Sequence, residues 1–244
     1  MAEFRPTRFQ IMPPIVKNLI IINVLMWIAS IVLFNTQDIY LTGKLGLFYF
    51  DSWFFEPWQL VTHMFMHANV TSGGGIVFFH ILFNMFALWM FGSVLESVWG
   101  AKRFLVFYLV AGFGAVLLHQ GVQALEVYNI TGSITNSLAE LNEHTGSIDK
   151  LQALYSVPAV GASGAIYGVL VGFAVLFPNT KLMMILLPIP IAAKYFVPVL
   201  IAIDLYLGVG RFEWDNTAHF AHLGGALFGF ILIMIWRRDR SKFY

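Results

Sequence analysis

Six apolar stretches, each about as long as a bilayer is thick, constrain this chain more than any other feature. A helix needs about 20 mostly apolar residues to cross a hydrocarbon core. Charged and turn residues bound the six stretches, which cover about residues 17–34, 76–98, 104–122, 162–177, 189–208 and 218–236. The fourth is short and rich in small residues, and Pro188, Pro190 and Pro198 make the start of the fifth irregular. We therefore expect an all-α polytopic membrane protein, a six-helix bundle in one domain covering residues 1–244.

The low charge content excludes an ordinary soluble domain. Charged residues make up 11% of the 244 residues, against roughly 25% in a typical soluble domain. A soluble fold of this size would need more polar side chains to cover its surface. The formal net charge of +1 gives no field for nucleic acid. The absence of cysteine excludes disulfides, thiolate metal sites and cysteine nucleophiles.

The distribution of basic residues predicts the orientation, because cytoplasmic loops carry an excess of Lys and Arg. With both termini inside, 10 of the 14 basic residues are cytoplasmic: Arg5, Arg8, Lys17, Lys102, Arg103, Lys181, Arg237, Arg238, Arg240 and Lys242. Two outer loops are then long. Residues 35–75 are rich in Phe and Trp and are expected to associate with the membrane, whereas residues 123–160 are polar and are expected to be solvated and mobile.

Uncharged polar residues within the expected spans are functional candidates, because burying polar groups in a membrane is costly. His80 and Asn84 lie four residues apart in the second span, Ser163 begins the fourth, and His222 lies near the start of the sixth. Even-numbered spans begin outside in this topology. The four side chains are therefore expected at one shallow depth below the outer surface.

A serine and a histidine at one depth suggest nucleophilic catalysis, because a hydroxyl is a weak nucleophile until an imidazole accepts its proton. The two helices must then lie unusually close. Small residues recur at four-residue spacing in both spans, at Gly164, Gly168 and Gly172 and at Ala221, Gly225 and Gly229. Such faces let helix backbones approach in membranes. His80, Asn84 and a backbone N–H near Ser163 could stabilise a developing oxyanion.

These residues resemble three motifs of the rhomboid intramembrane serine proteases. The run from Gly161 to Tyr167 is similar to their GxSGxxY motif, the run from Ala221 to Gly225 to their AH(L/I)(G/A)G motif, and the run from His80 to Asn84 to their HxxxN element. Further likeness is found at Trp58, Thr62–His67, Leu95, Glu96, Gly100, Arg103, Phe104, Pro178, Asn179, Asp204 and Leu205. The resemblance covers roughly residues 15–237, and it implies a rhomboid-like bundle.

The resemblance also implies roles for individual residues. Ser163 would be the nucleophile and His222 the base of a dyad, with His80 and Asn84 as the oxyanion-stabilising pair. Tyr167 would support the histidine ring, and Gly161 and Gly164 would support the site. The family cleaves transmembrane helices of other proteins near the membrane surface, so transmembrane substrates and lipid are the expected partners, with no cofactor and no metal. The fifth span corresponds to the family's proposed substrate gate.

Three departures from the family pattern concern the loops. Trp58-Gln59 stands where the family often has Trp-Arg, which removes a charge-assisted tie to the first loop. The glycine-rich stretch 71–75 lengthens the distance from His67 to His80. The outer loop 123–160 is also long. These departures affect loop structure and substrate preference rather than the dyad.

Several residues allow a second interpretation. Ser163 could be a small packing residue, and His219, three residues before His222, could be the base instead. Asp204 could be the third member of a triad, although a structural hydrogen-bonding role is favoured because the family works without one. Glu96 is expected to pair with Lys102 or Arg103 or to cap a helix.

The spacing of His63 and His67 can bind a metal, but without a third ligand a loop-anchoring role is favoured. Two other functional classes also stay open. An inactive rhomboid-like protein would bind transmembrane clients without cleaving them. A small transporter, channel or haem protein could also use intramembrane histidines. The simple six-span core suggests a bacterial inner membrane protein whose site opens to the periplasmic side. The substrate and the oligomeric state do not follow from the sequence.

Overall fold

The protein is mostly helical in a computed structural model that describes residues 11–69, 77–183, 189–210, 212 and 217–238. The longer helices are α1 (Pro14–Gln37), α4 (Phe79–Ala87), α5 (Ser93–Trp99), α6 (Ala101–Thr131), α8 (Ile148–Ser156), α9 (Ser163–Leu176), α10 (Ala193–Gly210) and α11 (His219–Arg238). The shorter elements are α2 (Leu41–Leu45), α3 (Gln59–Thr62), η1 (His63–Phe65), η2 (Leu88–Gly92), α7 (Leu138–Glu143), η3 (Thr145–Ser147), β1 (Lys181–Leu182) and β2 (Ile191–Ala192). The expected all-α fold class is confirmed.

Five helices in the described part of the chain are long and apolar enough to cross a membrane. They are α1, the continuous helix Phe79–Trp99 formed by α4, the π-helical turn η2 and α5, then α6, α10 and α11. The expected fourth span, 162–177, is the shorter helix α9, whose 14 residues extend about 21 Å. That length is less than the roughly 30 Å hydrocarbon thickness. A polytopic membrane bundle is confirmed, and the fourth of the six expected helices is shorter than a full span.

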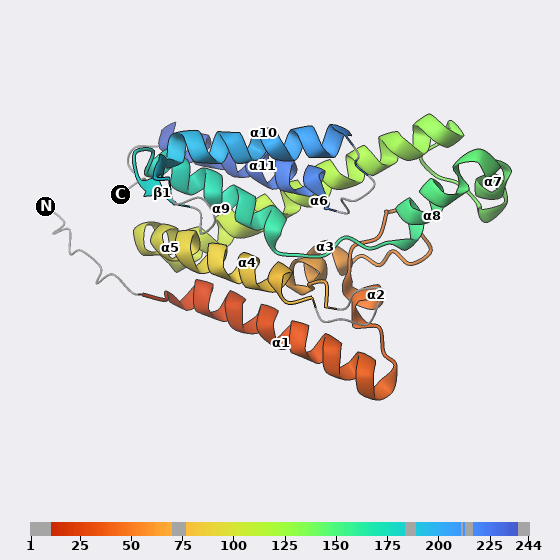
Figure 1. Cartoon of the computed structure of the whole chain (residues 1–244), viewed down its shortest axis with the longest axis horizontal. Coiled ribbons are helices and arrows are strands. Elements are labelled where there is room, and N and C mark those ends of the chain that lie inside the picture. Colours follow the sequence, from red (N-terminus) through yellow and green to blue (C-terminus); the bar gives the residue numbers. More distant parts are fainter. Residues whose placement is uncertain (1–10, 70–76, 184–188, 211, 213–216, 239–244) are drawn as a thin grey trace, which may run out of the picture.

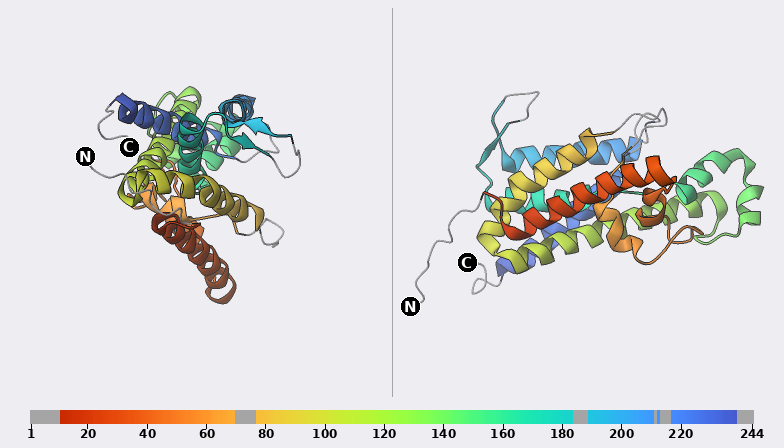
Figure 2. Two further views of the ribbon diagram at one scale, coloured as in Figure 1. Left: turned by 90° about the vertical axis from the view of Figure 1, so that its left-hand side faces the viewer. Right: turned by 90° about the horizontal axis from the view of Figure 1, so that it is seen from below.

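The short helix α9 lies in the middle of the bundle (Figures 1 and 2). Figure 1 shows α10 and α11 on one side of α9, with α4 and α5 on the other and α1 at the periphery. The start of α1 and the end of α11 lie at one end of the bundle, and α7 and α8 lie at the opposite end. We call the end with α7 and α8 the outer end, following the expected topology.

Glycines on α9 and α11 allow these two helices to touch through their backbones. A Cβ atom added to Gly225 would lie 1.8 Å from the carbonyl oxygen of Gly164, and one added to Gly229 would lie 2.7 Å from the Cα of Gly168. On its other side, α9 packs against α6, where a Cβ on Gly168 would lie 2.4 Å from the Cβ of Ala111. Close packing of small residues therefore fixes α9 between α6 and α11.

The polar stretch 123–160, expected to be a long outer loop, is mostly helical. Helix α6 continues to Thr131, and α7, η3 and α8 follow it. Ser137 and Glu140 form a capping box at the start of α7. We call residues 123–160 the outer unit. A separate small core holds it together and consists of Tyr49, Val127, Leu141, Leu151 and Tyr155. The chain is helical here although the sequence of this stretch is polar.

The first loop, residues 35–75, packs around a buried glutamine that replaces the arginine of the family pattern. The Gln59 side chain is 1% exposed, accepts a hydrogen bond from the Phe48 N–H at 3.3 Å and donates one to the Phe54 carbonyl at 2.8 Å. Neutral hydrogen bonds thus tie the loop together. The glycine-rich stretch 71–75 lies outside the described residues, as do Arg5, Arg8 and Pro188.

Glu96 caps a helix, which was one of its two expected roles. Its carboxylate accepts hydrogen bonds from the backbone N–H groups of Ile15 and Val16 at 2.9 and 2.8 Å. These groups belong to the first turn of α1, where backbone donors lack partners within the helix. Glu96 therefore joins the second expected span to the first at the inner end of the bundle.

Candidate active site

Ser163 is the first residue of α9, and the chain leading to it is held by the first loop. Leu47 and Ala159 pair through two backbone hydrogen bonds of 2.9 and 2.8 Å, and the Gly161 N–H donates to the His63 carbonyl at 3.0 Å. Gly161 has φ of +128°, a conformation that other residues rarely adopt. The serine therefore follows a sharp, fixed turn at the start of a buried helix.

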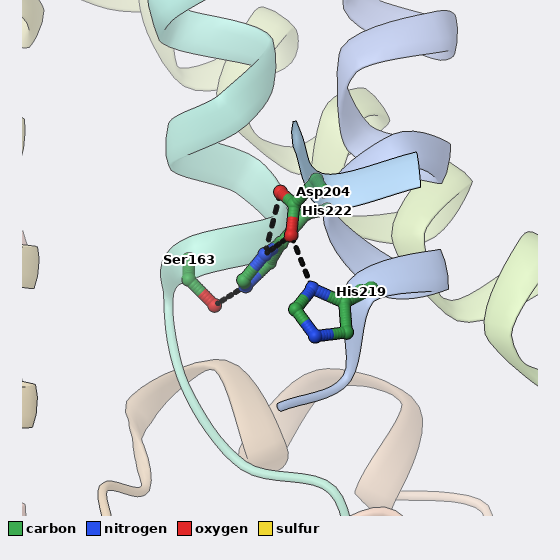
Figure 3. Close-up of polar contacts among 4 residues, drawn as sticks. All are labelled: Ser163, Asp204, His219 and His222. Carbon is green, nitrogen blue, oxygen red and sulfur yellow. Dashed lines mark hydrogen bonds and ion pairs between the residues drawn. The ribbon is translucent and has the colours of Figure 1, made fainter. Parts of the chain in front are cut away.

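His222 on α11 contacts Ser163 directly. The distance from His222 Nε2 to Ser163 Oγ is 2.8 Å, well within hydrogen-bond range. Figure 3 shows the serine hydroxyl pointing at this nitrogen from the start of α9. The histidine side chain is 12% exposed. The two residues are 59 positions apart in the chain, and the backbone contact between α9 and α11 brings them together.

Tyr167 lies one helical turn after Ser163 and stacks on the His222 ring. The two ring centroids are 4.4 Å apart and the planes differ by 9°. A parallel neighbour at this distance restricts rotation of the imidazole.

Asp204 on α10 contacts two histidines on α11. Its Oδ2 lies 3.0 Å from His222 Nδ1, and its Oδ1 makes a short contact with His219 Nδ1. The aspartate is 4% exposed and His219 is 7% exposed. Figure 3 shows Ser163, His222, Asp204 and His219 joined in one chain of contacts. The contacts in the structure thus link His219 to Asp204 and His222 to Ser163.

His80 and Ser163 both lie close to Gly161. A Cβ added to Gly161 would lie 3.1 Å from His80 Nε2 and 3.4 Å from Ser163 Oγ, so a side chain at this position would crowd both atoms. The Ala68 N–H donates to His80 Nδ1 at 3.4 Å. A neutral imidazole has one donor and one acceptor nitrogen. With Nδ1 as acceptor, Nε2 carries the proton and lies next to Gly161.

Asn84 contacts His80 rather than Ser163. It is buried on α4, and its amide donates to the His80 carbonyl at 2.8 Å, one turn earlier in the same helix. In the described contacts it supports the backbone that carries His80 and makes no hydrogen bond to Ser163.

A small cavity of about 20 Å³ lies beside the serine. Its lining includes His63, Gly161, Ser163, Gly164 and Ala221. A cavity of this size can hold one water molecule.

Asp204, His219 and His222 also form the one cluster of three metal-ligating side chains in the described part of the chain. Two imidazoles and a carboxylate can bind zinc. In this structure both Nδ1 atoms instead face the carboxylate at hydrogen-bonding or shorter distance.

The other histidine pair is buried in the first loop. Gln59 O and His63 Nδ1 are 2.8 Å apart, and the His67 ring packs edge-on against His80 with centroids 5.1 Å apart. Burial lowers the pKa of His63 to about 4 and, together with the neighbouring His80, the pKa of His67 to about 3. Both imidazoles are therefore neutral near pH 7 and serve here as packed side chains.

The sequence left a contact between Asp204 and His222 as the less favoured of two roles for Asp204. The spacing of His219 and His222 already places both on one face of a helix. The carboxylate stands on a different helix, so only the packing of α10 against α11 shows that it reaches both rings.

Comparison with known proteins identifies one family. The sequence model of the Rhomboid domain matches residues 54–239. The chain is similar to Rhomboid protein 1, mitochondrial, of Saccharomyces cerevisiae, with 29% identity over 180 residues, which are 72% of this chain and 44% of that protein. It is also similar to Rhomboid protease GluP of Bacillus subtilis, with 29% identity over 176 residues, 72% of this chain and 25% of that protein.

A third relative is Presenilin-associated rhomboid-like protein A, mitochondrial, of Danio rerio. The identity is 33% over 168 residues, which are 65% of this chain and 36% of that protein. The chain thus spans less than half the length of each of these relatives. Two of the three are named as mitochondrial and one comes from a bacterium.

Proposed function

The chain belongs to the rhomboid family, and on that premise we propose that it is an intramembrane serine endopeptidase with Ser163 as nucleophile and His222 as general base. The observation that carries the proposal is the 2.8 Å contact between Ser163 Oγ and His222 Nε2 at the start of a buried helix. A relative named as a protease, GluP, supports the same reaction class.

The first half of the reaction forms an acyl-enzyme. His222 Nε2 accepts the Ser163 hydroxyl proton while Oγ attacks the scissile carbonyl carbon, giving a tetrahedral oxyanion. The intermediate collapses as the C–N bond breaks, and the imidazolium gives its proton to the leaving amine. The new amino terminus departs, and the other part of the substrate stays bound to Oγ as an ester.

The oxyanion would lie near Gly161, between Ser163 and His80. His80 Nε2 lies close to Gly161 and carries the proton that a negative oxygen needs. The start of α9 adds backbone N–H groups without partners in the helix and the positive end of the helix dipole. Asn84 acts in this proposal by holding the turn that carries His80.

The second half of the reaction hydrolyses the ester. A water molecule gives a proton to His222 Nε2 and attacks the ester carbon, the bond to Oγ breaks, and Oγ recovers the proton. The small cavity beside Ser163 can hold such a water next to the reacting serine. The substrate proposed is a transmembrane segment of another protein, cleaved near the outer face, with membrane lipid as the other partner.

We place the protein in a bacterial inner membrane with both termini cytoplasmic and the site open to the periplasm. The excess of basic residues on one side of the expected spans supports this orientation. Because the chain has no cysteine, a single cysteine added at either end can be probed with a membrane-impermeant thiol reagent. Labelling of intact cells at either end would contradict the orientation.

Reconstitution with a single-span test substrate tests the activity. Wild-type protein in liposomes is expected to cleave the substrate and to react with a fluorophosphonate probe, which loses fluoride as it bonds to Ser163 Oγ. Ser163→Ala and His222→Ala are expected to lose both activities, while His219→Ala retains measurable cleavage. Cleavage by Ser163→Ala would refute the assignment, and a wild type inactive in both assays would favour client binding without cleavage.

A further inference from the structure

Asp204 is a buried carboxylate within an expected membrane span, a costly arrangement unless its charge is compensated. Two imidazole N–H groups compensate it, one at each oxygen, from His219 and His222. The approach of the two helices explains the contact: a Cβ on Gly208, one turn after Asp204, would lie 2.9 Å from the Cβ of His219. The helices α10 and α11 therefore meet closely beside the carboxylate.

The carboxylate determines which nitrogen of His222 carries the proton. An ionised carboxylate only accepts hydrogen bonds, so His222 Nδ1, 3.0 Å from Asp204 Oδ2, must be the donor. Nε2 of the neutral ring is then the acceptor, and it is the atom that faces Ser163 Oγ. Without this contact the imidazole could place its proton on Nε2, where it could not accept one from serine.

We propose that Asp204 is a positioning residue that completes a Ser163–His222–Asp204 triad, with His219 holding the second carboxylate oxygen. The proposal rests on the proposed protease function and deepens it. Asp204 sets the tautomer of His222 before the reaction and stabilises the imidazolium that forms as Ser163 is deprotonated. His219 keeps the carboxylate turned toward His222 and takes no proton from serine.

Asp204→Asn separates this role from a purely structural one. The amide has nearly the volume of the carboxylate and can still hydrogen-bond to both rings, so it can hold α10 against α11. Because the amide is neutral in either orientation, it does not stabilise the imidazolium. We expect kcat to fall at least about tenfold, and by up to about 10⁴-fold if the amide reverses the tautomer, with KM within about twofold of wild type.

Glu96→Gln is the matched control, because it also replaces a carboxylate that is 3% exposed and hydrogen-bonded at the edge of a span. Glu96 caps α1 and lies outside the site. This variant is expected to lower stability and to leave kcat unchanged. Thermal unfolding of both variants in detergent shows whether a loss of rate accompanies a loss of fold.

The same liposome assay and fluorophosphonate labelling decide between the outcomes. A low kcat and slow labelling of Asp204→Asn, with KM and thermal stability near wild type, would support the triad. Asp204→Asn with kcat within twofold of an active wild type would overturn the triad and leave the protease assignment intact. A loss of rate that follows a loss of stability would also overturn it, in favour of a structural role. A wild type without activity, or an active Ser163→Ala, would overturn both proposals.

Discussion

At the scale of single residues, His222 is restrained both at the face and at the edge of its ring. Tyr167 stacks on the face at a centroid distance of 4.4 Å, and Asp204 contacts Nδ1 at the edge. The stack fixes the plane of the ring, and the carboxylate fixes its rotation within that plane. Together they direct Nε2 toward Ser163 Oγ before any substrate is bound.

The stack predicts that the ring of Tyr167 contributes to activity beyond the hydrogen bond of its hydroxyl to Asp204. An aromatic pair of this kind contributes about 0.5–1.5 kcal/mol, so we expect Tyr167→Leu to lower kcat by roughly threefold to tenfold, and Tyr167→Phe to lower it less. The measurement is initial cleavage rate in liposomes. Tyr195→Leu, an exposed tyrosine on α10, serves as control. Equal losses in the Phe and Leu variants would contradict the stacking role.

Much of the candidate site could be proposed from residues alone. Ser163, His222 and His80 lie in recognisable motifs. The structure brings Ser163 into contact with His222 and places His80 close to Gly161, two residues before Ser163. Their catalytic roles stay predictions until tested. Asp204 could not be assigned in this way, because a single acidic residue in a span has no motif that specifies its neighbours.

At the scale of secondary-structure elements, the contact between α9 and α11 decides whether the site can form. Gly225 allows the α11 backbone to reach the Gly164 carbonyl. We predict that Gly225→Ala forces the helices apart, breaks the contact of Ser163 with His222 and lowers the free energy of unfolding by about 1–3 kcal/mol or more. Fluorophosphonate labelling and unfolding in denaturing detergent report the two effects.

Gly121→Ala on α6 is the control for that experiment, because nothing lies within 4 Å of the added methyl group. Alanine in a helix interior is favoured over glycine by about 0.5–1 kcal/mol, so this variant should be as active as wild type and slightly more stable. Normal labelling of Gly225→Ala would show that the two helices need not touch for the serine to react.

The length of a helix could be predicted only where the apolar stretch of the sequence ends at the same residue as the helix. Hydropathy ended the third span at residue 122, but α6 continues to Thr131, because backbone hydrogen bonding does not stop where the side chains become polar. The short helices α7 and α8 escaped prediction for a related reason. Their stability depends on the small core around Tyr155 rather than on length or apolar composition.

At the scale of the whole molecule, the first loop and the outer unit pack together at the outer end of the bundle. The Tyr155 hydroxyl donates to Asp51 at 2.8 Å, and the Ser52 hydroxyl donates to the Tyr155 carbonyl at 2.6 Å. The first loop also reaches inward to the turn before Ser163, through Leu47 and His63. Loss of packing in this loop would therefore disturb the site as well.

Buried neutral histidines make the fold sensitive to acid. The pKa of His63 is lowered to about 4 and that of His67 to about 3 by burial, whereas both would titrate near 6.5 in the unfolded chain. The unfolded state therefore binds more protons below that pH. Their contribution to stability is complete above about pH 6.5 and is lost progressively as the pH falls toward 4 and 3.

We therefore predict that the free energy of unfolding decreases between about pH 6.5 and 4, and that His63→Gln makes this decrease smaller. Tryptophan fluorescence during unfolding in denaturing detergent, repeated at several pH values, measures the effect. His144→Gln, in the outer unit, is the control variant. An unchanged pH dependence in His63→Gln would show that the buried imidazole is not responsible.

The sequence by itself determined the solvent, the approximate positions of the apolar helices and the family, because each depends on local composition or on short motifs. Apolar stretches of bilayer length can be recognised without knowing their neighbours. Only the tertiary structure decided the length and central position of α9, the helical outer unit and the two imidazoles facing Asp204. These features depend on contacts between residues far apart in the chain, which glycine packing between α6, α9, α10 and α11 brings within hydrogen-bond range.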